Sequence, residues 1–88
     1  METEDEKIEN DIEKIRAYLI EYWTPDVIKS IELIERPTKG HTIYRYLSII
    51  ERAGETIKIE TEKYWSWYMK EPIEGPFYDF KVIEKKKV

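Results

Sequence analysis

The spacing of apolar residues changes once along this chain, and this change constrains the fold more than any other feature. The first apolar set recurs at intervals of three or four: Ile8, Ile12, Ile15, Leu19 and Tyr22. Such intervals place side chains on one face of an amphipathic helix. From residue 41 onward, apolar residues alternate with polar ones, which is typical of strands. The sequence therefore predicts an α+β fold, with an N-terminal helix packed on one face of an antiparallel meander of three or four strands.

Local signals predict where the helix begins and ends. Thr3 and Glu6 have the spacing of a capping box, in which the threonine side chain accepts a hydrogen bond from the backbone. Pro25 disfavours helical geometry at the residue before it. The helix is therefore expected over about residues 4–23.

The segment from residue 25 to residue 36 has two interpretations. Pro25 could open a second helix, with Val27, Ile28, Ile31 and Ile34 on its inner side. Alternatively, a strand could lead to the turn-forming residues that follow it. We favour the strand, and the helix remains an alternative.

Three later strands are expected, at residues 42–52, 56–69 and 77–84. Ala53 and Gly54 suit the tight turn between the first two strands. Pro72, Gly75 and Pro76 are expected to break the chain before the last strand. The expected organisation is a single domain, 1–88, with the helix at about 4–23, the sheet at about 28–84 and a basic tail at 85–88.

Alternation assigns side chains to the two faces of the predicted sheet. The face expected under the helix carries Ile43, Leu47, Ile49, Ile57, Ile59, Trp65 and Trp67. The predicted core combines the helix and the sheet: Ile8, Ile12, Ile15, Leu19, Trp65 and Trp67. The opposite face is expected to carry Tyr44, Tyr46, Tyr64 and Tyr68. A single helix cannot cover both faces, so these four tyrosines require an explanation.

Three explanations fit the tyrosines. They could be half-exposed strand residues that pack across the sheet. They could form the contact of a homodimer or of another protein complex, because tyrosine is enriched at interfaces. They could also stack the bases of single-stranded nucleic acid. Duplex nucleic acid is not expected as a partner, because the chain has a net charge of −4 and no basic face is predicted.

The N-terminal segment is acidic, with eight acidic and three basic side chains in residues 1–24. Glu6, Glu9, Asp11 and Glu13 could present a negative patch to a basic, nucleic-acid-binding partner. The same residues could equally form an ordinary solvated face of the helix.

Residues that carry common enzyme chemistry are scarce. The chain has no cysteine and one histidine, His41, which excludes thiol nucleophiles and sites built from several cysteines or histidines. Its three glycines are too widely separated for a phosphate-binding loop. We therefore expect no catalytic residues, no metal and no cofactor.

The composition also suggests a habitat. The chain contains 15 glutamates, 11 lysines and no glutamine, a bias found in proteins of hyperthermophiles. A genome rich in A and T would favour the same residues. The acidic N-terminus does not resemble an export signal, so a cytoplasmic location without membrane contact is expected. Together these observations predict a non-catalytic interaction module that self-associates through the tyrosines.

Overall fold

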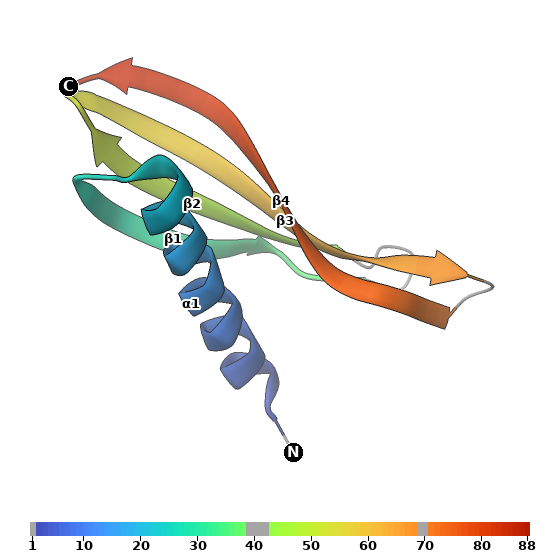
Figure 1. Ribbon diagram of the computed structural model, residues 1–88. Coiled ribbons are helices and arrows are strands. Elements are labelled where there is room, and N and C mark those ends of the chain that lie inside the picture. The colour runs from blue at the N-terminus through green and yellow to red at the C-terminus, as the bar shows by residue number, and fades with distance from the viewer. Residues whose placement is uncertain (1, 39–42, 69–70) are drawn as a thin grey trace.

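The computed structural model describes residues 2–38, 43–68 and 71–88, with the backbone alone for residues 67 and 68. The helix is α1 (Glu4–Trp23), and the strands are β1 (Val27–Glu35), β2 (Tyr44–Arg52), β3 (Glu55–Tyr68) and β4 (Glu71–Lys87). The strands form one four-stranded antiparallel sheet in the order β1-β2-β3-β4 (Figure 1). The predicted α+β meander is therefore confirmed, with four strands.

The ends of α1 agree with the capping signals in the sequence. The hydroxyl of Thr3 accepts a hydrogen bond from the backbone N–H of Glu6 at 3.2 Å. At the other end, Thr24 adopts a left-handed conformation with φ of 41°. This conformation stops the helix immediately before Pro25, which is incompatible with a helical residue preceding it.

Residues 27–35 form a strand, so the alternative of a second helix is wrong. β1 pairs with β2, and Ile31 lies opposite Ser48. The side chain of Ile31 points toward α1 and is buried in the core. His41 of the predicted loop lies outside the described residues, because the structure does not describe residues 39–42.

A tight turn joins β2 to β3 at the predicted position. Ala53 and Gly54 both have positive φ, 49° and 78°, as a two-residue type I′ hairpin turn requires. The carboxylate of Asp26, in the link between α1 and β1, accepts a hydrogen bond from the Ala53 N–H at 3.0 Å. This bond ties the link after α1 to the hairpin.

The last strand is longer than the sequence predicts. β4 begins at Glu71 and continues through Pro72, Gly75 and Pro76, which were expected to break the chain. Among the described strands, β4 has only β3 as a neighbour, and an edge strand tolerates proline because one side of its backbone needs no partner. The predicted basic tail is also part of β4, since residues 85–87 pair with the start of β3.

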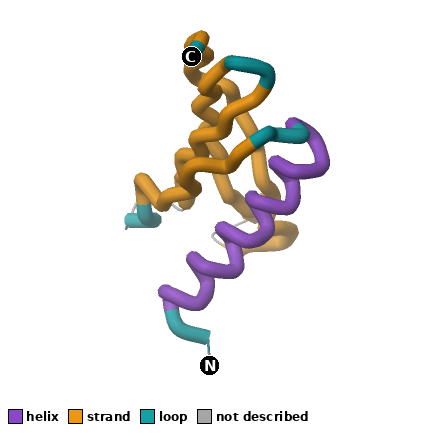
Figure 2. Tube along the Cα trace, turned by 90° about the vertical axis from the view of Figure 1, so that its left-hand side faces the viewer, coloured by secondary structure: helices purple, strands orange, loops and turns teal. Residues whose placement is uncertain are grey.

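The core lies between α1 and one face of the sheet, and Figure 2 shows the helix along one side of the strands. The buried apolar residues come from the helix and from β1, β2 and β3: Ile15, Leu19, Ile31, Tyr46, Ile50, Ile57 and Ile59. Ile8 and Ile12 are partly buried against this cluster. The predicted helix contribution is therefore confirmed, whereas Trp65 is only half-buried and Trp67 has no described side chain.

The predicted orientation of β2 is wrong. Tyr46 and Ile50 are fully buried on the face that α1 covers, while Leu47 and Ile49 lie on the opposite face and are half-buried. β2 has large apolar residues at both odd and even positions, so alternation alone does not identify its inner face. The register with β3 identifies it, because Ile50 lies opposite the buried Ile57.

One end of the β3–β4 hairpin extends beyond the rest of the sheet. Among the described residues, the β2–β3 ladder ends at the pair Tyr44–Lys63, and from Tyr64 to Tyr68 the strand β3 pairs with β4 and with no other described strand. We call the described residues 64–68 and 71–77 the arm. It projects on the right of Figure 1 and contributes to the elongated shape of 46 × 25 × 21 Å.

Candidate functional site

A buried polar cluster joins the helix to the three later strands. Asp11 of α1 is 3% exposed, and its carboxylate accepts hydrogen bonds from three side chains. The Tyr46 hydroxyl donates at 2.6 Å, the Tyr78 hydroxyl at 2.9 Å, and the Lys63 ammonium at 2.8 and 2.9 Å. Tyr46 is on β2, Lys63 on β3 and Tyr78 on β4. We call these four residues the Asp11 cluster.

Lys63 is nearly as buried as its partner, at 8% exposed. Its Nζ lies 5.1 Å from the centre of the Tyr44 ring and 5.2 Å from the centre of the Trp65 ring. Cations are attracted to the faces of aromatic rings, more strongly where water is excluded. Lys63 is therefore held by one carboxylate and two rings.

The cluster raises the pKa values of its tyrosines. For both Tyr46 and Tyr78, burial is the largest cause of the raised pKa, because it disfavours the charged phenolate. The hydrogen bond donated to Asp11 and the negative charge of that carboxylate raise each pKa further. Burial also raises the pKa of Tyr44. The tyrosines of the cluster therefore remain protonated hydrogen-bond donors under neutral conditions.

This arrangement holds elements of the fold together. The Asp11 carboxylate accepts four hydrogen bonds, two on each of its oxygens. A buried charge that loses its partner is strongly destabilising. The cluster therefore fixes the position of α1 over β2, β3 and β4.

A small cavity opens beside the cluster, between α1 and the base of the arm. Its volume is about 290 Å³. Its wall includes three lysines and two aromatic rings: Lys7, Lys14, Lys63, Tyr44 and Trp65. We call it the lysine cavity.

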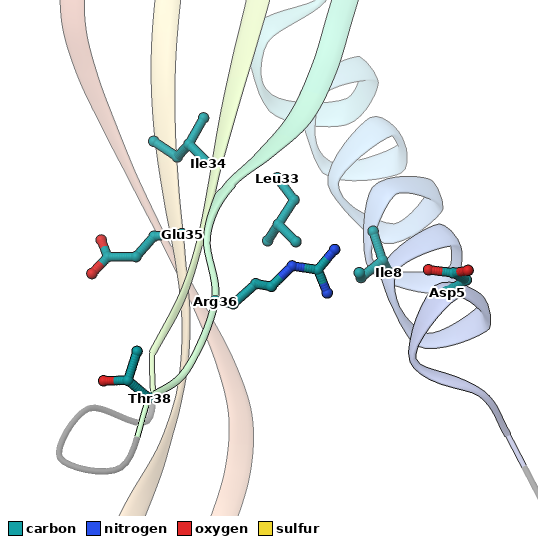
Figure 3. A pocket seen from close by; sticks show the side chains of 7 residues that line it. All are labelled: Asp5, Ile8, Leu33, Ile34, Glu35, Arg36 and Thr38. Atoms are coloured by element: carbon teal, nitrogen blue, oxygen red, sulfur yellow. The ribbon is translucent and has the colours of Figure 1, made fainter.

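A larger groove, of about 590 Å³, lies between the start of α1 and the end of β1. Figure 3 shows Leu33 and Arg36 pointing toward Ile8 and Asp5 of the helix, with Glu35 on the far side. Arg36 is already paired with Glu4 across this groove. The cation of the groove is therefore engaged by the protein itself.

The four predicted interface tyrosines do not share a face. Tyr46 is fully buried under α1, and Tyr44 lies on the same side of the sheet. Tyr64 is on the opposite face, where its ring packs at 5.6 Å from that of Phe77. The side chain of Tyr68 lies outside the described residues. The prediction of one open tyrosine face is therefore wrong.

The predicted acidic patch is also divided. Glu6, Glu9 and Glu13 are exposed, whereas Asp11 is buried in its cluster. A side chain with three partners in the core cannot present its charge to a basic protein. Only the three glutamates remain as candidate patch residues.

The sheet face opposite α1 carries charged side chains that pair with one another. Arg45 lies within 3.0 Å of Glu35, 2.9 Å of Glu60 and 3.2 Å of Glu62. Lys58 pairs with Glu84 at 3.0 Å. These pairs are typical of a solvated face.

The sequence did carry a signal for the Asp11 cluster, although we did not predict it. Asp11 is three residues after Ile8 and four before Ile15, which places it on the apolar side of the helix. Lys63 shares the alternation of Ile57 and Ile59. An acidic residue on the inward face of the helix and a basic residue on the inward face of the strand indicate a buried ion pair.

No known protein family matches the chain, and neither the curated proteins nor the solved structures compared with it give a match. In the described part of the chain, no helix has the length and apolar character needed to cross a membrane. The described side chains also form no group of three acids or histidines that could hold a metal ion.

Proposed function

We propose that this chain is a non-catalytic, cytoplasmic interaction module that self-associates, and that the arm is its contact surface. The observation that supports this proposal is that, among the described residues, the arm extends beyond the strands β1 and β2. A two-stranded hairpin is marginally stable by itself in water. This one nevertheless carries Tyr64, Trp65, Trp67, Tyr68 and Phe77 within one short segment.

The arm exposes three large hydrophobic side chains. Ile73 is 62% exposed, Phe77 38% and Tyr64 37%. Among its described residues, only Glu71 and Glu74 are charged. A few well-packed side chains near the centre of a contact surface, often aromatic ones, supply most of the binding energy of typical interfaces.

A second copy of the chain is the occupant that this surface fits. A two-fold axis places the apolar residues of one arm against the same residues of the other, with the glutamates at the rim. Pro72 and Pro76 lack the N–H groups needed to extend the sheet along this edge, which favours contact through side chains. A small domain also gains core by pairing.

Light scattering over a concentration series tests the proposal. The mass of the wild-type chain should rise above 10.7 kDa toward twice that value. Ile73→Glu should keep the monomer mass, because a carboxylate would be buried in the contact. Ile20→Glu is the matched control, since Ile20 is 55% exposed on α1 and is not part of the arm, and this variant should associate like the wild type.

Two results would overturn the proposal. The first is a wild-type mass that stays at that of the monomer across the series. The second is equal dissociation of both variants. A monomer that binds single-stranded oligonucleotides in a salt-sensitive manner, and loses this binding with Ile73→Glu, would instead support nucleic-acid binding by the arm.

A further inference from the structure

The lysine cavity carries more basic than acidic side chains, whereas the chain as a whole is acidic. The protein has a net charge of −4, and α1 has an acidic first turn. The cavity wall nevertheless carries Lys7, Lys14 and Lys63 against Glu2 and Asp11. The cavity is therefore a locally positive site in an acidic molecule.

Both acids of the cavity already have partners. Asp11 accepts from Lys63, Tyr46 and Tyr78, so its charge is compensated within the core. Glu2 accepts a hydrogen bond from Asn10 at 3.1 Å. By contrast, Lys7 and Lys14 form no ion pair with any residue that the structure describes.

Lys63 supplies a donor that the protein does not use. An ammonium group has three N–H bonds, and two of them are directed at the two oxygens of Asp11. Within the described chain the third finds no acceptor, only the rings of Tyr44 and Trp65. This buried donor lies in the wall of the cavity.

The geometry allows the two remaining lysines to converge on the same point. Lys7 and Lys14 are two helical turns apart, about 10 Å along the axis. Asn10 and Asp11 lie between them and also line the cavity. The long side chains of Lys7 and Lys14 can therefore both reach an anion that is bound beside Asn10 and Asp11.

We propose that the lysine cavity binds a phosphate group, either free or as a compact monoester. A tetrahedral dianion can accept from several ammonium groups at once, and lysine binds phosphate as a point charge. The Asp11 carboxylate fixes Lys63 in place before the anion arrives. The cavity shares Trp65 and Pro76 with the arm, so phosphate binding and self-association are measured separately.

The test uses the whole chain and inorganic phosphate, followed by NMR of the Trp65 indole N–H at constant ionic strength. Phosphate should shift this signal saturably, with a dissociation constant on the order of 1 mM. Lys7→Gln and Lys14→Gln should each weaken binding about fivefold, as expected for loss of one exposed charge contact. Phenyl phosphate, titrated in parallel, distinguishes a monoester from the free ion by its tighter binding.

Lys29→Gln is the matched control, because Lys29 pairs with Glu51 outside the cavity. It should bind phosphate like the wild type. A linear, unsaturated response of the Trp65 signal to phosphate would overturn the proposal. An equal response to chloride would do the same, as would equal weakening in Lys29→Gln. Because Trp65 also belongs to the arm, light scattering at the concentration of the titration, with and without phosphate, separates phosphate binding from a change in self-association.

Discussion

At the scale of single residues, the attachment of α1 to the sheet depends on the carboxylate of Asp11. Asp11→Ala would leave Lys63 as a buried charge without a counterion, and two tyrosine hydroxyls without their acceptor. We expect the free energy of unfolding to fall by about 3–5 kcal/mol, the usual cost of breaking a buried ion pair on one side. Urea denaturation of the purified variant measures this loss.

Two further variants show whether the loss comes from the unpaired charge. Adding Lys63→Met to Asp11→Ala removes the stranded cation, so the double variant should be more stable than Asp11→Ala alone. Glu13→Ala, at an exposed position on the same helix, should change stability by less than about 0.5 kcal/mol. A double variant no more stable than the single one would contradict our account of the cluster.

At the scale of elements, the arm depends on the close contact between Gly75 and Trp65. A Cβ atom at residue 75 would lie 2.9 Å from Cδ1 of the Trp65 ring and 3.1 Å from the Tyr64 carbonyl oxygen. Gly75 also has φ of 128°, which side chains with a Cβ rarely adopt. Gly75→Ala should therefore loosen the arm and displace Trp65, while the core over β1 to β3 stays folded.

Amide hydrogen exchange measures this local effect. Arm amides should exchange faster in Gly75→Ala, whereas core amides near Ile50 and Ile59 should be unchanged. Gly54→Asn is the control, since a Cβ at residue 54 meets no atom within 4 Å and asparagine tolerates its φ of 78°. Uniformly faster exchange across the sheet would show that the arm and the core unfold together.

The elements differ in how far the sequence predicts them. The bounds of α1 follow from Thr3, Pro25 and the apolar intervals, which are all local signals. The inward face of β2 does not follow from local signals, because Tyr46 and Leu47 are both large and apolar in character. The register with the partner strand decides which of the two is buried. Ring contacts at the base of the arm, such as that of Tyr44 with Trp65, likewise depend on register.

Over the whole molecule, polar contacts are divided between the two sides of the sheet. The Asp11 cluster lies beneath α1, and the ion pairs around Arg45 lie on the opposite side. Networks of ion pairs contribute more at high temperature, because ions are less favourably hydrated there. The hot habitat inferred from composition stays a prediction. Surface ion-pair networks like that around Arg45 are common in proteins from such habitats.

The stability of the whole molecule should fall at alkaline pH because of the buried tyrosines. Tyr46 and Tyr78 have folded-state pKa values raised above the usual 10.0, by burial first and then by their bonds to Asp11. The folded protein therefore retains two protons that the unfolded chain releases. The contribution of these hydroxyls is fully present below about pH 10 and is progressively lost as the pH rises above it.

Urea denaturation at a series of pH values above 10 measures this linkage. Each retained proton adds about 1.4 kcal/mol per pH unit to the decline in the free energy of unfolding. Tyr78→Phe keeps the ring but removes one of these protons, so its decline should be shallower than that of the wild type by about this amount. Because the remaining alkaline titrations are common to both proteins, the difference between the two slopes isolates Tyr78. Equal slopes would show that the Tyr78 hydroxyl ionises alike in the folded and unfolded chains, and that its bond to Asp11 does not hold the proton.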